Sequence, residues 1–279
     1  MKIYVCPCIE KEKSMTALPS VTAALLEYGI TSVFDESVRA LYNDERVEYA
    51  NGDIIDRCDM LLTVGGDGMM LKWGKRAAFA GKPLIGINTG RLGFMTSLDI
   101  DCLDKLSAAA DGSCTFSTRM MLSAEFPENE STALNDIVLF KDVNSKLPEF
   151  TVRINGITVT KVRADGLIFS TPTGSTAYAL SAGGPIIEPT VECILLTPLC
   201  AHTLLNRPMI FSAGDKVTVS YSAYEGSRVN ISIDGSKGTE LPAGTELVIR
   251  KSPVVLRIAE LGERSFYTTV SEKLMTPLK

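Results

Sequence analysis

The chain has 279 residues, of which 45% are hydrophobic and 22% are charged, and its formal net charge is −5. This length predicts one large domain or two ordinary ones with a sizeable core, and the composition excludes wholesale disorder. The negative charge argues against nucleic acid as a partner. No apolar run approaches the roughly 20 residues that span a bilayer, so we expect no membrane partner either.

The N-terminus and the cysteines indicate the compartment. The chain opens with MKIYVCPCIEKEK, in which charges return after a very short apolar stretch. This pattern predicts a first β-strand and not a signal peptide. The 7 cysteines are odd in number and spread from Cys6 to Cys200. We therefore expect reduced thiols in a cytoplasmic protein.

Over roughly the first 110 residues, strand-like and helix-like segments alternate. The strand-like segments are short apolar runs, at residues 2–6, 32–35, 59–64 and 83–88. Helical spacing is found at residues 17–28, from near Met69 to before Gly81, and at residues 98–110. Unbroken apolar strands with helices between them predict a parallel sheet that is covered on both faces.

After residue 118 helical periodicity largely disappears, and one helix is expected, at residues 175–182. Short strands separated by turn residues are predicted at 134–140, 150–154, 166–170, 217–221, 229–233, 247–249 and 254–258. The second part of the chain is therefore predicted to be rich in β-strands.

A glycine loop, Gly65-Gly66-Asp67-Gly68, joins an apolar strand to a helix-like segment. Glycines expose backbone N–H groups to phosphate oxygens, and a helix N-terminus favours anions. A carboxylate in such a loop repels the ligand unless it binds Mg²⁺ or accepts a proton from an attacking hydroxyl. Alternatively, Asp67 caps the following helix. The flanking strand and helix favour phosphate chemistry.

A hydroxyl-rich turn, residues 171–176, follows the apolar strand at 166–170. Such a segment can simply cap a helix, but a cap needs only one hydroxyl and this segment has more. The additional hydroxyls favour hydrogen bonds to a base, sugar or phosphate. Tyr178 is placed to stack on a ring. Two further segments, NTGRLGF at 88–94 and LND at 134–136, place polar side chains at strand ends. Open α/β sheets bind ligands at such ends, although an asparagine there can also simply close a turn.

In this order and spacing, GGDG, NTGRLGF, LND and TPTGSTAYALSAGGP resemble the motifs of bacterial NAD kinases, and the resemblance extends to the NRP segment at Asn206. Loops similar to GGDG also occur in diacylglycerol kinases, sphingosine kinases and phosphofructokinases, whereas TPTGSTAY joined to LND is much more specific. The resemblance implies a Rossmann-like α/β domain at 1–118, a β-rich NAD-binding domain at 119–258, and a segment at 259–279 that returns to the first domain. The implied reaction transfers a phosphoryl group from ATP, or polyphosphate, to the 2′-hydroxyl of the adenosine ribose of NAD, giving NADP.

The resemblance also implies roles for individual residues. Asp67 matches the catalytic aspartate, which acts as a base for the ribose hydroxyl. Gly68 matches the phosphate-binding loop, and Lys72 matches a residue that contacts nucleotide. Phe94 matches an aromatic residue beside the dinucleotide. Residues matched to the dinucleotide site are Asn135, Asp136, Arg163, Asp165, Thr173, Thr176, Ala177, Tyr178, Ala179, Leu180 and Ser181. Arg163 would meet the new 2′-phosphate. Asp165 would contact the nicotinamide half, often from a neighbouring subunit, which implies a homodimer or homotetramer.

A divalent metal, with Mg²⁺ as the expected ion, is implied because phosphates crowd Asp67 in a chain whose sequence has no dense basic cluster. Met69 departs from the pattern, since Thr or Ser usually follows GGDG in the family, and this puts donor binding in question. Two other functions compete with NAD phosphorylation. A lipid or sugar kinase would share the GGDG loop, and a non-catalytic sensor would bind the dinucleotide without turnover.

Overall fold

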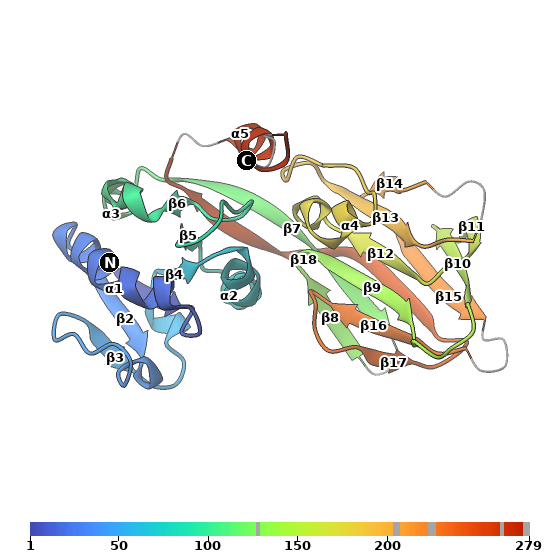
Figure 1. Cartoon of the computed structure of the whole chain (residues 1–279), viewed down its shortest axis with the longest axis horizontal. Helices are drawn as coiled ribbons and strands as arrows, with labels where there is room; N and C mark the ends of the chain where they lie inside the picture. The colour runs from blue at the N-terminus through green and yellow to red at the C-terminus, as the bar shows by residue number, and fades with distance from the viewer. Residues whose placement is uncertain (127–128, 203–206, 223–226, 263–264, 276–279) are drawn as a thin grey trace. The chain divides into compact units, whose positions relative to one another are not determined.

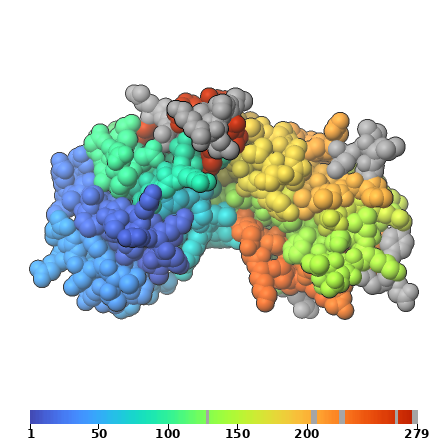
Figure 2. Space-filling model, viewed as in Figure 1, coloured from blue at the N-terminus to red at the C-terminus, as the bar shows by residue number. Residues whose placement is uncertain are grey.

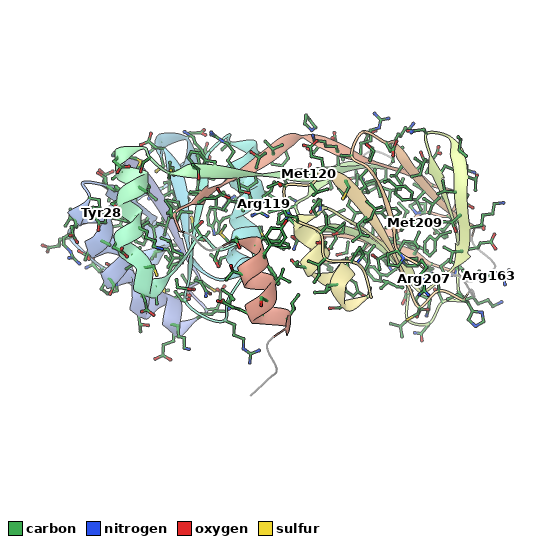
Figure 3. All side chains as sticks on the ribbon, turned by 90° about the horizontal axis from the view of Figure 1, so that it is seen from above. Tyr28, Arg119, Met120, Arg163, Arg207 and Met209 are labelled. Carbon is green, nitrogen blue, oxygen red and sulfur yellow. The ribbon has the colours of Figure 1, made fainter. Side chains whose placement is uncertain are left out.

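The computed structural model describes residues 1–126, 129–202, 207–222, 227–262 and 265–275, so Asn206 lies outside the described residues (Figure 1). The chain divides into two compact units, Met1–Arg119 with Val255–Lys279, and Met120–Val254. It passes from one unit to the other within two long strands, β7 (Thr115–Phe126) and β18 (Glu246–Glu260). Arg119 and Met120, at the first of these passages, are labelled in Figure 3.

The first unit is built on a parallel sheet with the strand order β3-β2-β1-β4-β5, and the end of β18 continues it beside β5. The strands are β1 (Lys2–Pro7), β2 (Thr31–Asp35), β3 (Glu48–Ala50), β4 (Met60–Gly65), β5 (Leu84–Asn88) and the short β6 (Leu98–Asp99). β4 and β5 run side by side, so the loops that follow them leave the same edge of the sheet.

Helices cover both faces of this sheet. The helices of this unit are α1 (Glu12–Glu27), α2 (Asp67–Phe79), α3 (Ser107–Asp111) and, from the C-terminal segment, α5 (Phe266–Val270) followed by a turn of π-helix, Ser271–Met275. Ile3 packs in one core cluster with Leu18 of α1. Tyr4, which points to the opposite face, meets the Trp73 ring of α2 edge-on at 5.2 Å between ring centroids. The predicted Rossmann-like α/β domain, with helices on both faces, is confirmed.

The helix predicted at residues 98–110 is mostly wrong. Leu98–Asp99 form strand β6, Ile100–Leu106 form 3₁₀ turns, and only Ser107–Asp111 are α-helical. Cys102 interrupts the helical backbone with φ −119° and ψ 33°. The apolar spacing that suggested a helix instead places Leu98, Leu106 and Ala109 against the core of the unit.

The second unit contains two antiparallel sheets. One has the order β14-β13-β12-β9-β16-β17, and the other joins β11-β10-β15 to β18, with β7 pairing β8. The strands not yet located are β8 (Asn129–Ala133), β9 (Asp136–Lys141), β10 (Glu149–Ile154), β11 (Ile157–Arg163), β12 (Gly166–Ser170), β13 (Cys193–Leu199), β14 (Met209–Ser212), β15 (Val217–Ser222), β16 (Val229–Ile233) and β17 (Thr239–Leu241). The predicted β-rich second part is confirmed.

The core of the second unit lies between its two sheets. Phe169 of β12 packs there with Phe150 of β10 and Tyr221 of β15. Ile168 points to the other face, where it packs with Ala179 of the short helix α4 (Tyr178–Ser181). Two predictions differ here. Residues 247–249 and 254–258 belong to one strand, β18, and the helix predicted at 175–182 is a 3₁₀ turn, Thr173–Thr176, followed by α4. Among the described residues, no helix is long and apolar enough to cross a membrane.

Candidate functional site

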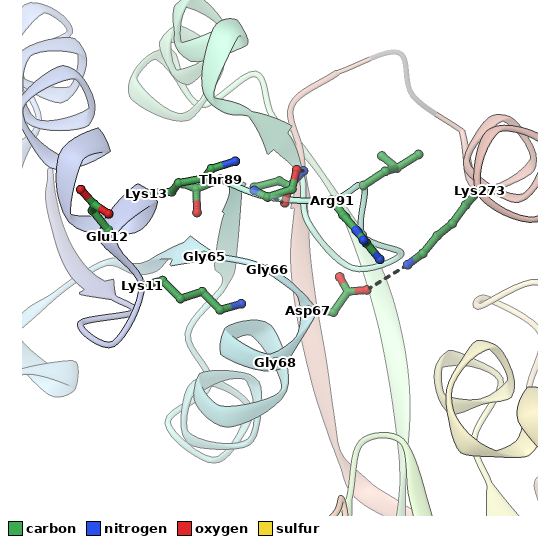
Figure 4. A pocket seen from close by; sticks show the side chains of 14 residues that line it. Lys11, Glu12, Lys13, Gly65, Gly66, Asp67, Gly68, Thr89, Arg91 and Lys273 are labelled. Carbon is green, nitrogen blue, oxygen red and sulfur yellow. Dashed lines mark hydrogen bonds and ion pairs between the residues drawn. The ribbon is translucent and has the colours of Figure 1, made fainter. Parts of the chain in front are cut away.

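The first unit contains a cavity of about 580 Å³ at the edge of the sheet where β4 and β5 end (Figure 4). It is lined by residues 65–68 of the GGDG loop, by residues 88–93 after β5, by residues 11–13 at the start of α1, and by Lys273. The GGDG loop and the NTGRLGF segment therefore belong to one site. Parallel strands bring them together, because both segments follow neighbouring strands at the same edge.

The N-terminus of α2 opens into this cavity. Gly66 is the N-cap and makes no side-chain cap hydrogen bond, so the first N–H groups of a 13-residue helix have no such partner. A Cβ added at Gly66 or Gly68 would meet nothing within 4 Å. Glycine at these positions leaves the backbone open to a ligand, and the helix dipole makes an anion the favoured one.

Asp67 does not cap α2, which excludes that interpretation of the sequence. Its carboxylate crosses to the loop after β5, where Oδ2 accepts the Phe94 N–H at 2.8 Å and Oδ1 accepts the Met95 N–H at 3.0 Å. Gly93 is required by this contact, since a Cβ there would overlap Asp67 Oδ1. The carboxylate is thus held in a defined position beside the glycine loop.

Four cationic side chains line the same cavity: Lys11, Lys13, Arg91 and Lys273. Lys273 Nζ lies 4.0 Å from Asp67 Oδ2 and 4.3 Å from the centroid of the Phe94 ring. The Phe94 and Phe266 rings lie 6.2 Å apart between their centroids, and this contact attaches the C-terminal segment to the rest of the first unit. Figure 2 shows this segment in red. The sequence has no dense basic cluster, but the fold gathers cations that are widely separated along the chain.

Two sequence-predicted site residues of this unit, Lys72 and Phe94, lie outside the cavity lining, and so does Met69, which departs from the family pattern. Lys72 is exposed on α2, beyond the residues that line the cavity. Met69 is buried, and its side chain packs so close to Gly65 that a Cβ there would lie 2.7 Å from Met69 Cγ. Met69 therefore fills the inside of the loop and presents no side chain to the cavity.

In the second unit, the LND and TPTG segments form one cluster at the junction of β9 and β12. Asp136 lies opposite Ser170 in the antiparallel register. Thr171 Oγ1 donates to the Leu134 carbonyl at 2.6 Å, and the Thr171 N–H donates to the Asn135 carbonyl at 2.9 Å. A Cβ at Gly174 would overlap the Asn135 carbonyl oxygen, so glycine is needed for this close approach.

Most of the hydroxyls in this cluster are used internally. Ser175 Oγ donates to the Pro172 carbonyl at 2.6 Å, and Thr176 Oγ1 donates to the Thr173 carbonyl at 3.2 Å. Two buried atoms, Asn135 Oδ1 and Thr173 Oγ1, make no hydrogen bond with the described residues. An unsatisfied buried polar group costs about 1–3 kcal/mol, and these two atoms are the ones in this cluster that a ligand could satisfy.

Asp136 is 6% exposed and lies near Asp234, which belongs to a turn after β16. Burial and then the negative charge of Asp234 raise the pKa of Asp136 to about 7. The Asp-Gly dipeptide at 234–235 marked a turn, but nothing in the sequence connected it with LND.

The remaining predicted residues separate into two groups. Tyr178, 48% exposed, and Ser181 lie on the surface of α4 beside the cluster, with Thr176, Ala177 and Leu180 partly buried, whereas the Ala179 methyl is packed in the core. Arg163 and Asp165 precede β12, while the cluster lies at its other end. Five residues at about 3.3 Å each place these ends roughly 15 Å apart.

Arg163 lies at the surface of the second unit. Its side chain is 52% exposed, with Nε 3.6 Å from Glu149 Oε2, and it is labelled at the edge of the second unit in Figure 3. Asp165 Oδ1 lies 3.8 Å from Lys141 Nζ and is similarly exposed. One chain therefore does not bring Arg163 and Asp165 together with Asn135 and Asp136.

Comparisons with known proteins place both units in one family. A family model described as the ATP-NAD kinase N-terminal domain matches residues 10–111, and one described as the ATP-NAD kinase C-terminal domain matches residues 134–261. The chain is 35% identical to the NAD kinase of Thermoanaerobacter sp. (strain X514), over 98% of both chains. It is 34% identical to the NAD kinase of Desulforamulus reducens, over 88% of this chain and 90% of that protein.

Two solved structures share the fold. Yeast NADH kinase in complex with NADH gives a TM-score of 0.87 at 24% identity, covering 99% of this chain and 87% of that chain. An NAD kinase from Archaeoglobus fulgidus in complex with ATP gives a TM-score of 0.77 at 24% identity, covering 99% of both chains. With both family domains and full-length relatives matched, the chain belongs to the NAD kinase family of phosphotransferases that act on an alcohol group.

Proposed function

We propose that the protein transfers a phosphoryl group from ATP to the 2′-hydroxyl of the adenosine ribose of NAD, producing NADP. The observation that carries this proposal is the anion pocket of the first unit, with a fixed carboxylate, Asp67, at its mouth. The glycines and cations of this pocket are sufficient to bind phosphates, and a carboxylate is not needed for that binding. A carboxylate in this place is useful to an enzyme that removes a proton from an attacking hydroxyl.

The donor phosphates are assigned to the pocket of the first unit. The N–H groups at the start of α2 and the cations Lys11, Lys13, Arg91 and Lys273 supply hydrogen bonds and positive charge. Phosphoryl transfer depends on positioning and on charge neutralisation more than on covalent chemistry, and this pocket offers both. Polyphosphate presents the same anionic oxygens, so it is the alternative donor.

Asp67 is assigned as the base. Each of its oxygens accepts one backbone N–H, and a carboxylate has about four acceptor positions, so two remain for a substrate hydroxyl. The two N–H bonds orient the group before substrate arrives. Phe94, next to this loop and packed on Phe266, is the aromatic residue assigned to the dinucleotide.

The dinucleotide is assigned to the second unit. Asn135 Oδ1 and Thr173 Oγ1 are the buried atoms that a base or ribose would satisfy, and Asp136 and Tyr178 lie in the same cluster. Residues 176–181 would follow the adenosine. Arg163 and Asp165, at the other end of β12, are assigned to the dinucleotide held by a neighbouring copy in a homodimer or homotetramer.

A divalent metal fits this site as a substrate-bound ion. Among the described residues, no group of three or more His, Cys, Asp or Glu side chains could hold a metal. Mg²⁺ commonly uses one or two carboxylates together with substrate phosphates, and Asp67 is the carboxylate present at the pocket. When bound, such an ion would neutralise charge on the transferred phosphoryl group.

The direct test supplies the purified chain with ATP, NAD and Mg²⁺ and detects NADP with an NADP-specific dehydrogenase. NADP formation is expected. A sensor would bind NAD without forming NADP, and a lipid or sugar kinase would consume ATP only with its own acceptor. Polyphosphate in place of ATP identifies the donor, and replacing NAD by 2′-deoxy-NAD tests the acceptor hydroxyl.

Removal of divalent metal should abolish this reaction. With EDTA in excess over Mg²⁺, NADP formation is expected to fall to the assay background, because the ion that would join the substrate phosphates to the Asp67 carboxylate is then missing. Adding back Mg²⁺ should restore the rate, which excludes irreversible damage as the cause. Full activity in excess EDTA would contradict the metal assignment.

Arg163→Ala should weaken NADP binding about tenfold or more and NAD binding much less. The arginine guanidinium donates charge-assisted hydrogen bonds to the 2′-phosphate dianion, and each contributes about 1.5–3 kcal/mol to the binding free energy. Its hydrogen bonds to the neutral hydroxyl of NAD are weaker. Isothermal titration calorimetry with both ligands measures the difference. Tyr178→Ala is the control and should weaken both ligands equally, since they share the adenosine. Equal losses in Arg163→Ala would show that another residue holds the 2′-phosphate.

A further inference from the structure

Strand β16 ends in a tight turn whose geometry is set by its sequence. Asp234 and Gly235 have φ of 49° and 72°, and the Ser236 N–H donates to the Ile233 carbonyl at 2.9 Å. Positive φ at both central positions is the turn that best fits the twist of antiparallel strands, and Asp-Gly is a favoured pair for it. The sequence therefore explains the turn, but not what the Asp234 side chain does there.

The Asp234 carboxylate binds three consecutive backbone N–H groups of the LND segment. Oδ2 accepts the Leu134 N–H at 2.9 Å, and Oδ1 accepts those of Asn135 at 2.8 Å and Asp136 at 3.1 Å. In return, the Asp234 N–H donates to the Asp136 carbonyl at 3.0 Å. These four bonds join segments about 100 residues apart in the chain.

The bonds fix the backbone at the start of β9, where the side chains of the candidate site emerge. Hydrogen bonds to a carboxylate are stronger than neutral ones, and three of them on one group leave the backbone little freedom. Asn135 Oδ1, held at this point, is buried and makes no hydrogen bond with the described residues. A side chain can keep an unsatisfied atom in place for a ligand only if its backbone is firmly held.

We propose that Asp234 is a positioning residue for dinucleotide binding, which holds the backbone of residues 134–136 so that Asn135 and Asp136 face the ligand. This inference rests on the proposed function, in which those two side chains contact NAD. In this role Asp234 acts through the backbone of residues 134–136.

Asp234 also acts on Asp136 through its charge. On the β12 side Asp136 faces Ser170, which is uncharged, and on the β16 side the charged group is Asp234. Burial and this charge raise the pKa of Asp136 to about 7, so Asp136 changes its protonation near neutral pH. NAD affinity should therefore change with pH around 7. Removing the negative charge at position 234 stabilises the ionised form of Asp136 and lowers its pKa. The midpoint of the pH dependence of NAD affinity should therefore move to lower pH.

Asp234→Asn tests the inference. Asparagine tolerates positive φ, so the turn is retained, but its NH₂ group cannot accept a hydrogen bond, so at least one of the three N–H groups loses its acceptor. We expect the Kd for NAD to rise about tenfold or more, and the pH midpoint of NAD binding to shift to lower pH. The Kd for ATP should not change, because the glycine-loop pocket belongs to the first unit. Calorimetry from pH 5.5 to 8.5 provides all three readouts without turnover.

Asp215→Asn is the matched control, since Asp215 also holds a turn of the second unit. Its Oδ2 accepts the Ser212 N–H at 3.1 Å and its Oδ1 accepts Asn155 Nδ2 at 2.8 Å. NAD affinity and the pH midpoint should be unchanged in this variant. Thermal unfolding of both variants shows whether either has lost its fold.

Each outcome separates the inference from the proposed function. Unchanged NAD affinity and midpoint in Asp234→Asn, or equal losses in both variants, would overturn the inference alone. A wild-type chain that binds no NAD would overturn both. Should Asp234→Asn not fold, Asp136→Asn decides the charge argument: the midpoint near pH 7 should vanish, and its persistence would refute the Asp136–Asp234 pair as its source.

Discussion

Asp67→Asn is expected to lower kcat for NADP formation by about 10²–10⁴-fold, the range typical of a lost general base, while NAD affinity stays nearly intact. The amide keeps one acceptor for the N–H groups of Phe94 and Met95, but it cannot accept the proton of the ribose hydroxyl. Steady-state kinetics give kcat, and calorimetry gives the Kd for NAD.

The control for this substitution is Asp59→Asn. Asp59 Oδ2 accepts the Lys2 N–H at 2.8 Å in the same unit, outside the cavity lining, so kcat should be close to that of the unaltered chain. If Asp67→Asn also retained near-normal turnover, Asp67 would be only the residue that fastens the loop after β5, and the base would have to be sought elsewhere.

Gly93→Ala should lower kcat by about 10²-fold without unfolding the chain. The new Cβ would overlap Asp67 Oδ1 and lie 3.0 Å from Thr96 Oγ1, so the carboxylate must move. A misplacement of about 1 Å at a catalytic group can cost that much, because positioning supplies a large part of the rate. The substitution adds one methyl group and changes no charge, which isolates the geometry of Asp67 from its chemistry.

Gly90→Ala in the same loop is the comparison. A Cβ at Gly90 meets nothing within 4 Å, so Asp67 keeps its place and kcat at saturating substrate should stay near that of the unaltered chain, whatever happens to KM. Circular dichroism and thermal unfolding verify the fold of both variants. Equal kcat in the two variants would show that the position of the Asp67 carboxylate does not limit the reaction.

Local patterns in the sequence predicted the strands and the class of both units. β1, β4 and β5 are unbroken apolar runs, and such runs occur where helices cover both faces of a sheet. Where local patterns failed, tertiary contacts had overridden them. Residues 98–110 have helical spacing, yet the backbone kinks at Cys102, and β18 continues through Pro253 although the sequence suggested two strands.

The chemistry of the candidate site divides in the same way. The order of GGDG, NTGRLGF, LND and TPTGSTAY identified the family, because the residue types that bind phosphate and nucleotide are determined locally by backbone freedom and side-chain chemistry. Only the tertiary structure decided which groups meet. Strand pairing brings Lys11 and Arg91 to one cavity and places Asp234 on the backbone of LND, and the packing of Phe266 on Phe94 brings Lys273 to the same cavity. The sequence alone could not show these contacts, because they join residues about 80 to 260 positions apart, and tertiary packing, not the local pattern, sets their distance.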